Sequence, residues 1–203
     1  MMTTVETRET LKPLRLVLVT GSGGVGKTSL IEGFHTDGRK IYPGLTDFII
    51  AGKVDKDLIA NGFTEVRDPS YVKRYRTQSY GQVFQQTEEI IAGGRTALVN
   101  ASFRLEIGKL GWERRYDELA KKHEAILKII RLVTAPETLY RRLVARDAIT
   151  DHHKLVDLET WKAWLQEEPI EMEMPPGSLI LTNNGNIGDF PNLVQQAMAF
   201  LKE

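Results

Sequence analysis

The hydrophobic positions of this chain form short runs that alternate with longer amphipathic stretches. Each run is rich in Val, Ile and Leu and short enough to be a buried parallel strand. The runs cover residues 14–20, 96–101, 125–134 and 178–182. Apolar residues recur at helical spacing over 27–35, 79–92, 112–123, 136–146, 157–168 and 190–201. This alternation predicts an α/β fold, in which helices cover both faces of a parallel sheet.

A further strand is expected in the less regular segment 39–63, either near Ile41 or at Phe48–Ile50. We therefore predict a three-layer sandwich around a five-stranded parallel sheet, formed by residues 14–203. Residues 147–157 are polar and lack a periodic pattern, and prolines interrupt the chain further on. This predicts an inserted lid over about 147–176, and we expect residues 1–13 to be a flexible lead.

Composition narrows the possible classes only slightly. The chain has 203 residues, which fits one domain, and 27 basic residues balance 27 acidic ones. Net charge therefore argues neither for nor against a nucleic-acid partner, and only a local patch could do so. Cysteine is absent, which excludes disulfides and thiolate metal sites. No apolar run approaches the roughly 20 residues of a membrane span, so we expect no membrane partner and a cytoplasmic location.

The strongest motif lies between the first expected strand and the helix after it. It reads Gly21-Ser22-Gly23-Gly24-Val25-Gly26-Lys27-Thr28 and matches G-x-x-x-x-G-K-[ST] at every fixed position. Such glycines let successive backbone N–H groups turn inward around an anion, and the helix N-terminus adds positive potential. Together with Ser29, these residues form the predicted binding site for ATP.

Two residues of the motif have expected roles in phosphate chemistry. Lys27 should reach the β- and γ-phosphates, so it is a candidate catalytic residue. Thr28 should place its hydroxyl on Mg²⁺, which neutralises charge between those phosphates. The motif therefore predicts a nucleoside triphosphate and Mg²⁺, and the kinase favoured below makes the expected cofactors ATP and Mg²⁺.

The loop alone does not distinguish a GTPase from a kinase. A GTPase usually carries D-x-x-G after a later strand and N-K-x-D or T-K-x-D after another, and neither is present. The nearest segment to the second motif, Thr182-Asn-Asn-Gly185, has no lysine and no aspartate. The strand 96–101 carries Asn100 where many P-loop proteins place an aspartate for Mg²⁺. These departures favour a kinase.

Three later segments resemble the P-loop kinase superfamily, in particular polynucleotide-kinase-like and nucleoside-monophosphate-kinase-like phosphotransferases. They are EEIIAGGRTALVNASFRLEIGKLGWERRYDELAKKH, IIRLVTAPETLYRRLVARD and LILTNNG. The resemblance implies that Arg146 and Arg142 clamp ATP phosphates from one helix face. It also implies that Asn183 lies at the wall of the adenine site.

The same resemblance implies a base for an acceptor hydroxyl. The polynucleotide-kinase-like group places an aspartate just after its second strand, and Asp47 in YPGLTDFI is the best match. Asp68 is a second, weaker candidate. The basic and aromatic segment YVKRYRTQSY contains Arg74 and Arg76, which could bind a nucleotide or nucleic-acid acceptor. Arg104, after the strand 96–101, could line the same cleft.

The sequence thus predicts a kinase that moves the γ-phosphate of ATP to a hydroxyl or phosphate of a nucleoside, nucleotide or nucleic acid. A 5′-hydroxyl and a hydroxymethylated base in DNA both belong to this acceptor class. Two alternatives remain open: a nucleoside-monophosphate kinase, and a small regulatory GTPase or ATPase switch.

Overall fold

A computed structural model gives the structure of the chain. It describes residues 13–41, 47–50, 77–104, 106–107, 109–147, 149–167, 172–185 and 190–203. Within these ranges, the side chains of 35–41, 47–50, 77–79 and 149–150 are not described. The helices and strands follow the order β1 Leu14–Thr20, α1 Lys27–Ile41, β2 Asp47–Ile50, α4 Thr77–Ala92, β3 Ala97–Asn100, α5 Arg114–Lys122, β4 Ala125–Val133, α6 Pro136–Arg146, α7 Ile149–His152, α8 Leu158–Glu167, β5 Leu179–Thr182 and α9 Phe190–Lys202.

The described strands form one five-stranded parallel sheet, as the sequence predicts. Its order is β2-β3-β1-β4-β5, so β1 lies at the centre between β3 and β4. Six of the seven β1 residues are buried, which explains why this strand is an unbroken apolar run. The polypeptide leaves β1 at the carboxyl edge of the sheet, where open α/β sheets bind ligands.

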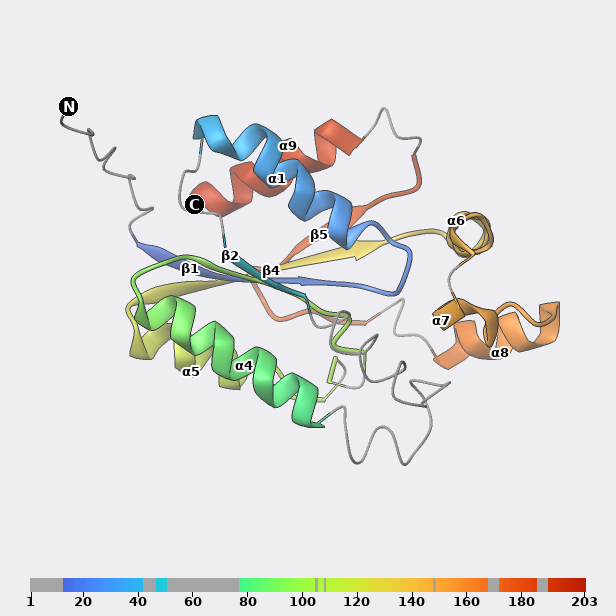
Figure 1. Cartoon of the computed structure of the whole chain (residues 1–203), viewed down its shortest axis with the longest axis horizontal. Coiled ribbons are helices and arrows are strands. Elements are labelled where there is room, and N and C mark those ends of the chain that lie inside the picture. Colours follow the sequence, from blue (N-terminus) through green and yellow to red (C-terminus); the bar gives the residue numbers. More distant parts are fainter. Residues whose placement is uncertain are drawn as a thin grey trace, which may run out of the picture.

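Helices cover both faces of the sheet and make three layers (Figure 1). Val17 and Val19 of β1 belong to the hydrophobic cluster that includes residues of α1 and α9. Leu16 and Leu18 point to the other face, into the cluster formed with α4 and α5. This alternation follows from the two-residue period of a strand, and it divides the core into two halves.

The second strand corrects one expectation about position. The run DFII forms β2, so Asp47 is the first residue of the strand and does not follow it. Asp47 lies level with Ala97, which also pairs with Leu16, whereas the phosphate loop begins only after Thr20. At about 3.3 Å per residue, the backbone of Asp47 is therefore about 13 Å along the strand direction from the carboxyl edge. The apolar residues 48–50 form the rest of this strand.

A separate group of helices stands at the carboxyl edge of the sheet (Figure 1). Helix α6 begins at Pro136, as expected for proline in a first turn, and Asp147 ends it with a left-handed φ of 45°. Helices α7 and α8 follow, and we call residues 149–167 the α7–α8 segment. Trp161 of α8 packs against Tyr140 of α6, with ring centroids 5.2 Å apart. This contact joins the segment to α6.

No helix in the described part of the chain is long and apolar enough to cross a membrane.

Candidate active site

The P-loop joins β1 to α1, and its backbone has the shape that the glycines predict. Gly21, Gly24 and Gly26 have φ values of 133°, 90° and 100°, which side-chain-bearing residues rarely adopt. A Cβ on Gly21 would lie 2.3 Å from the carbonyl oxygen of Leu132, and one on Gly26 would lie 2.7 Å from Asn183 Nδ2. The motif therefore needs glycine at these positions for steric as well as conformational reasons.

The side chain of Lys27 lies over the loop that precedes it. Its Nζ donates hydrogen bonds to the carbonyl oxygens of Gly21 and Ser22, at 2.7 and 2.9 Å. Lys27 is also the first residue of α1, so the N–H groups and positive end of the helix point to the same place. This arrangement fits the phosphates of a nucleotide.

Thr28 contacts the end of the neighbouring strand β3. Its Oγ1 accepts a hydrogen bond of 3.2 Å from the side-chain amide of Asn100. Asn100 lies level with Val19, two residues before the P-loop begins. The exposed Thr28 hydroxyl fits the expected position for Mg²⁺, and Asn100 supplies a neutral amide at the place of the usual carboxylate. Ser29, next to Thr28, is also exposed.

Asn183, after β5, holds the P-loop from the other side. Its Nδ2 donates to the carbonyl oxygen of Val25 at 2.8 Å, and its side chain is buried. Its own backbone carbonyl accepts a hydrogen bond from Thr134 Oγ1 at 3.2 Å. The sequence places this residue at the nucleotide site, and the structure adds a function that it did not predict. Asn183 ties the β5–α9 connection to the phosphate loop.

Arg142 lies beside this connection. Its guanidinium donates to Asn183 Oδ1 at 3.3 Å and to the carbonyl oxygen of Gly185 at 3.2 Å. Burial lowers the pKa of Arg142 below its ordinary value, and the charge of Arg141 lowers it further, but an arginine stays protonated at neutral pH. Arg142 thus donates to Thr134 and to the loop predicted to border the adenine, whereas its helix neighbour Arg146 donates to Asp151 of the α7–α8 segment.

Arg146 approaches the P-loop together with Lys154, a residue that we did not identify from the sequence. A Cβ on Gly23 would lie 3.6 Å from Lys154 Nζ and 3.8 Å from a terminal nitrogen of Arg146. Both cations bind one carboxylate, Asp151. Lys154 donates to Asp151 Oδ1 at 2.9 Å, and Arg146 Nε donates to Oδ2 at 2.9 Å. We call Arg146, Asp151 and Lys154 the Asp151 cluster.

The two partners shift the pKa of Asp151. Burial alone raises the pKa of this carboxyl, but the hydrogen bonds and charges of Lys154 and Arg146 outweigh burial. The net pKa is below the ordinary value of 3.8, so the carboxylate is ionised at neutral pH. Two positive charges and one negative charge therefore lie beside Gly23.

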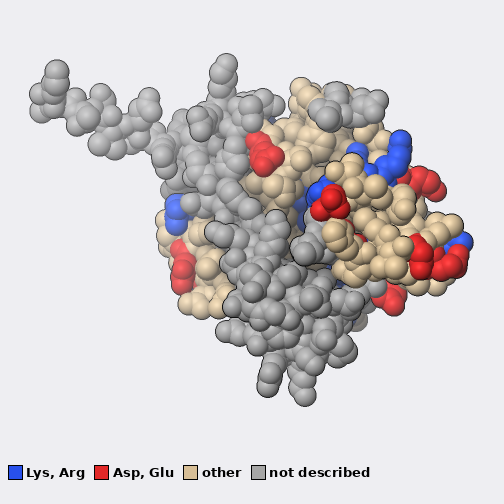
Figure 2. All heavy atoms as spheres, turned by 45° about the vertical axis from the view of Figure 1, so that its right-hand side comes forward, with Lys and Arg blue, Asp and Glu red and all other residues tan. Residues whose placement is uncertain are grey.

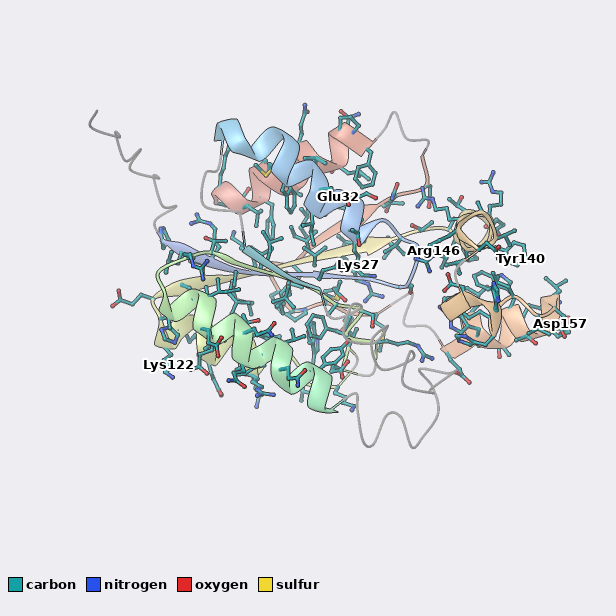
Figure 3. All side chains as sticks on the ribbon, in the orientation of Figure 1. Lys27, Glu32, Lys122, Tyr140, Arg146 and Asp157 are labelled. Carbon is teal, nitrogen blue, oxygen red and sulfur yellow. The ribbon has the colours of Figure 1, made fainter. Side chains whose placement is uncertain are left out.

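Figure 3 shows Lys27 and Arg146 at the same edge of the sheet, on α1 and at the end of α6. In Figure 2, basic side chains gather along the border between the lobe at the right and the rest of the described surface. The side chains of Lys154 and Arg146 near Gly23, and that of Lys27 on the carbonyl oxygen of Gly21, bring three cations to the phosphate loop.

Two of the other predicted site residues, Arg104 and Asp47, lie in the described part of the chain. Arg104 donates to Glu167 Oε2 at 3.3 Å, an ion pair that joins the segment after β3 to the end of α8. Asp47 begins β2, at the far end of the strand from the P-loop. Its role as a base remains a prediction, but this position gives it no support. Arg74, Arg76 and the alternative base Asp68 lie outside the described residues.

Sequence reasoning missed Asp151 and Lys154 because their segment has no periodic pattern. The pair is three residues apart, which is the spacing of neighbours on a helical turn. That signal is common on protein surfaces and does not reveal that Asp151 is 1% exposed. Only the packing of the α7–α8 segment on α6 identifies it.

Comparison with known proteins agrees with this geometry. A family model described as an AAA domain matches residues 16–169, well over half of the chain and including the P-loop and α7. The chain belongs to this family of AAA domains. The predicted α/β fold, which P-loop kinases share, is confirmed. No curated protein sequence matches the chain.

Solved structures of kinases share the fold of this AAA domain. A sugar kinase from Janibacter sp. has a TM-score of 0.62 and 16% identity, over 93% of this chain and 95% of that one. An APS kinase from Mycobacterium tuberculosis, solved with AMPPNP and APS, has a TM-score of 0.55 and 16% identity, over 94% and 98%. A gluconokinase from Sinorhizobium meliloti has a TM-score of 0.53 and 15% identity, over 92% and 93%. At such identities the likeness concerns the fold.

Proposed function

We propose that the protein is an ATP- and Mg²⁺-dependent kinase that transfers the γ-phosphate to a hydroxyl or phosphate group of a nucleoside, nucleotide or nucleic acid. The observation that carries the proposal is the approach of Arg146 and Lys154 to Gly23 of the P-loop, whose first carbonyl oxygens bind Lys27. A phosphoryl group held there would meet positive charge from the P-loop and from these two cations. Phosphoryl transfer depends mainly on such positioning and charge.

The α7–α8 segment acts as a lid in this proposal. Its Lys154, with Arg146 of α6, already reaches the P-loop, and the tryptophans of α8 pack into the core beside α6. A covered site excludes water, so the phosphoryl group passes to the acceptor and is not lost by hydrolysis. A regulatory switch that hydrolyses its nucleotide has no need of this arrangement.

The proposed transfer has a simple balance. An acceptor oxygen bonds to the γ-phosphorus while the bond from that phosphorus to the β–γ bridging oxygen breaks. ADP leaves with the bridging oxygen, and the proton of a hydroxyl acceptor passes to a base or to solvent. Lys27 and Arg146 would stabilise the charge on the transferred group. Bound Mg²⁺ supplies further neutralisation of the phosphates, and Thr28 is the residue that would hold it.

Arg142 and Asn183 would border the base of the donor. Both lie at the β5–α9 connection, where Arg142 meets the carbonyl of Gly185 and Asn183 meets the P-loop. The contacts of Arg142 favour this position over the phosphate clamp that the sequence suggested. The planar guanidinium of Arg142 suits stacking against a nucleobase.

A transfer assay separates the possible functions. The protein is incubated with γ-labelled ATP or GTP and single acceptors: nucleosides, nucleoside monophosphates, 5′-hydroxyl oligonucleotides, DNA with hydroxymethylated bases, and water alone. Because the fold neighbours are named as sugar, gluconate and APS kinases, a sugar, gluconate and APS belong in the same panel.

We expect label on one organic acceptor, with ATP as donor. Label on a nucleoside monophosphate would identify the nucleoside-monophosphate kinase alternative. Release of labelled inorganic phosphate from GTP, with no labelled acceptor, would contradict the kinase proposal and favour the switch. A Lys27→Ala variant serves as the inactive control in every arm.

A further inference from the structure

The Asp151 cluster has one more positive charge than its internal balance requires. Asp151 is 1% exposed, and Lys154 and Arg146 both bind it, each through a different carboxylate oxygen. A buried carboxylate needs a cationic partner, but one is enough for neutrality. The cluster therefore holds a surplus positive charge, carried by a Lys154 side chain that is 11% exposed and an Arg146 side chain that is 45% exposed.

The position of this surplus charge points to an anion. Lys154 Nζ and an Arg146 nitrogen lie 3.6 and 3.8 Å from where a Cβ on Gly23 would be. Gly23 belongs to a loop whose backbone N–H groups and helix terminus already favour negative charge. Two like-signed features next to each other repel unless an anion lies between them. A triphosphate is the anion that this loop is built to hold.

The ammonium of Lys154 is held in a defined orientation. Its side chain is 11% exposed, with Asp151 Oδ1 on one side and the ring of Trp164, 5.2 Å from Nζ to the centroid, on another. An ammonium has three N–H donors, and the bond to Asp151 uses one. Asp151 and Trp164 thus fix the group while leaving donor capacity on the side that faces Gly23.

We infer that Lys154 binds the phosphates of the donor nucleotide and that Asp151 is the positioning residue that holds Lys154 and Arg146 against the P-loop. The inference rests on the proposed function, because it names a further phosphate-binding residue of the same site. Asp151 itself contacts the two cations and not the nucleotide.

Calorimetric titration of the full chain with Mg²⁺ and AMPPNP, ADP or AMP tests this directly. Lys154→Ala should weaken AMPPNP binding about tenfold to about a hundredfold, the usual range for one charge-assisted hydrogen bond. ADP should lose less, and AMP should bind as it does to the wild type. Lys154→Arg keeps the charge and should recover most of the affinity.

Lys162→Ala is the matched control. Lys162, on α8 of the same segment, also forms an ion pair with a residue three positions away. Its Nζ lies 2.8 Å from Glu159 Oε1. Its removal should leave the affinity for all three nucleotides unchanged. Asp151→Asn removes the positioning charge with little change of volume. It should reproduce the order of losses seen for Lys154→Ala, with triphosphate affected most.

The outcomes are distinguishable. If Lys154→Ala binds AMPPNP like the wild type, the inference is wrong, whereas the proposed function still stands on label transfer by the wild type. If the variant loses equal affinity for AMPPNP, ADP and AMP, together with a lower melting temperature, Lys154 is only structural and the inference is again wrong. If the wild type transfers phosphate to no acceptor but Lys154→Ala selectively loses triphosphate, the inference holds and the kinase proposal fails.

Discussion

The P-loop and the α7–α8 segment form the two walls of one site, but they are specified in different ways. Every fixed position of the P-loop is visible in the sequence, because glycine at φ values near 90–133° has few substitutes. The α7–α8 segment has no such motif, and its charges matter only because packing on α6 brings them to Gly23. One wall is specified by backbone conformation and the other by tertiary contact. Substitutions in the P-loop and in the α7–α8 segment should therefore differ in their effects on activity and stability.

The largest effect is expected from Lys27 in the P-loop. Lys27→Ala removes the ammonium group that would stabilise the negative charge on the transferred phosphoryl group, so kcat should fall about a thousandfold. The melting temperature should change little, because the hydrogen bonds of Lys27 to Gly21 and Ser22 lie within the loop that precedes it. Steady-state kinetics with thermal melts check this. A fall in kcat of less than tenfold would show that the α7–α8 segment, and not Lys27, provides most of the stabilisation of the transferred group.

The next largest effect is expected at a glycine of the P-loop, and it is compared with a glycine outside the loop that has open space around it. Gly21→Ala places a Cβ 2.3 Å from the Leu132 carbonyl oxygen at a φ of 133°, and should lower the free energy of unfolding by about 3 kcal/mol. Gly94 has a φ of 73° but no atom within 4 Å of such a Cβ. Gly94→Ala should therefore cost only about 1 kcal/mol. Denaturant melts of both variants decide, and equal losses would contradict the steric argument.

Asn100 is the point where the P-loop wall departs from the usual P-loop pattern. Asn100→Asp would put a carboxylate 3.2 Å from the Thr28 hydroxyl, at the place where the amide nitrogen now lies. The apparent affinity for Mg²⁺ in the transfer assay should rise about tenfold, the lower end of the usual effect of such supporting residues. Asn100→Ser, which also loses the amide but adds no charge, is the control. An unchanged Mg²⁺ titration would show that Mg²⁺ is not held near β3.

The Asp151 cluster should respond to pH in a predictable direction. Because the pKa of Asp151 in the folded chain is below the ordinary 3.8, the carboxylate stabilises the fold above about pH 4. This contribution is lost as pH falls through the lowered pKa. The difference in unfolding free energy between wild type and Asp151→Asn should thus be constant from pH 6 to 9 and shrink in acid. A difference that changes between pH 6 and 9 would mean that another group controls the cluster.

The smallest effect is expected at the outer end of the α7–α8 segment. A terminal guanidinium nitrogen of Arg104 lies 3.3 Å from Glu167 Oε2, and the Glu167 side chain is 62% exposed. Solvent weakens such a pair, so Glu167→Gln should change stability by less than about 1 kcal/mol and leave nucleotide affinity unchanged. A clear loss of AMPPNP binding would show that the segment is held in place from this end as well as from Asp151.

The sequence predicted the parts of the molecule that depend on local pattern. The four apolar runs became β1, β3, β4 and β5 with boundaries shifted by at most one residue, and Pro136 marked the start of α6. The P-loop was identified residue by residue. These features follow from short-range rules: period, capping and glycine conformation.

What the sequence could not supply depends on distant packing. Asp47 was expected after the second strand because the family resemblance implies an aspartate there, whereas its register with Ala97 makes it the first residue of β2. Arg142 and Arg146 are four residues apart on one helix, yet one bonds to the β5–α9 connection and the other to Asp151. Periodicity places both on a similar face but does not say what each will meet.

The position of Lys27 has a consequence for the thermodynamics of nucleotide capture. Its hydrogen bonds to the carbonyl oxygens of Gly21 and Ser22 hold the P-loop in a closed conformation around the Lys27 ammonium group. Loop and lysine are thus ordered before any phosphate arrives, and binding exchanges two internal hydrogen bonds for new ones. Little backbone freedom remains to be lost, so capture should carry a small conformational-entropy penalty and proceed close to the rate of encounter.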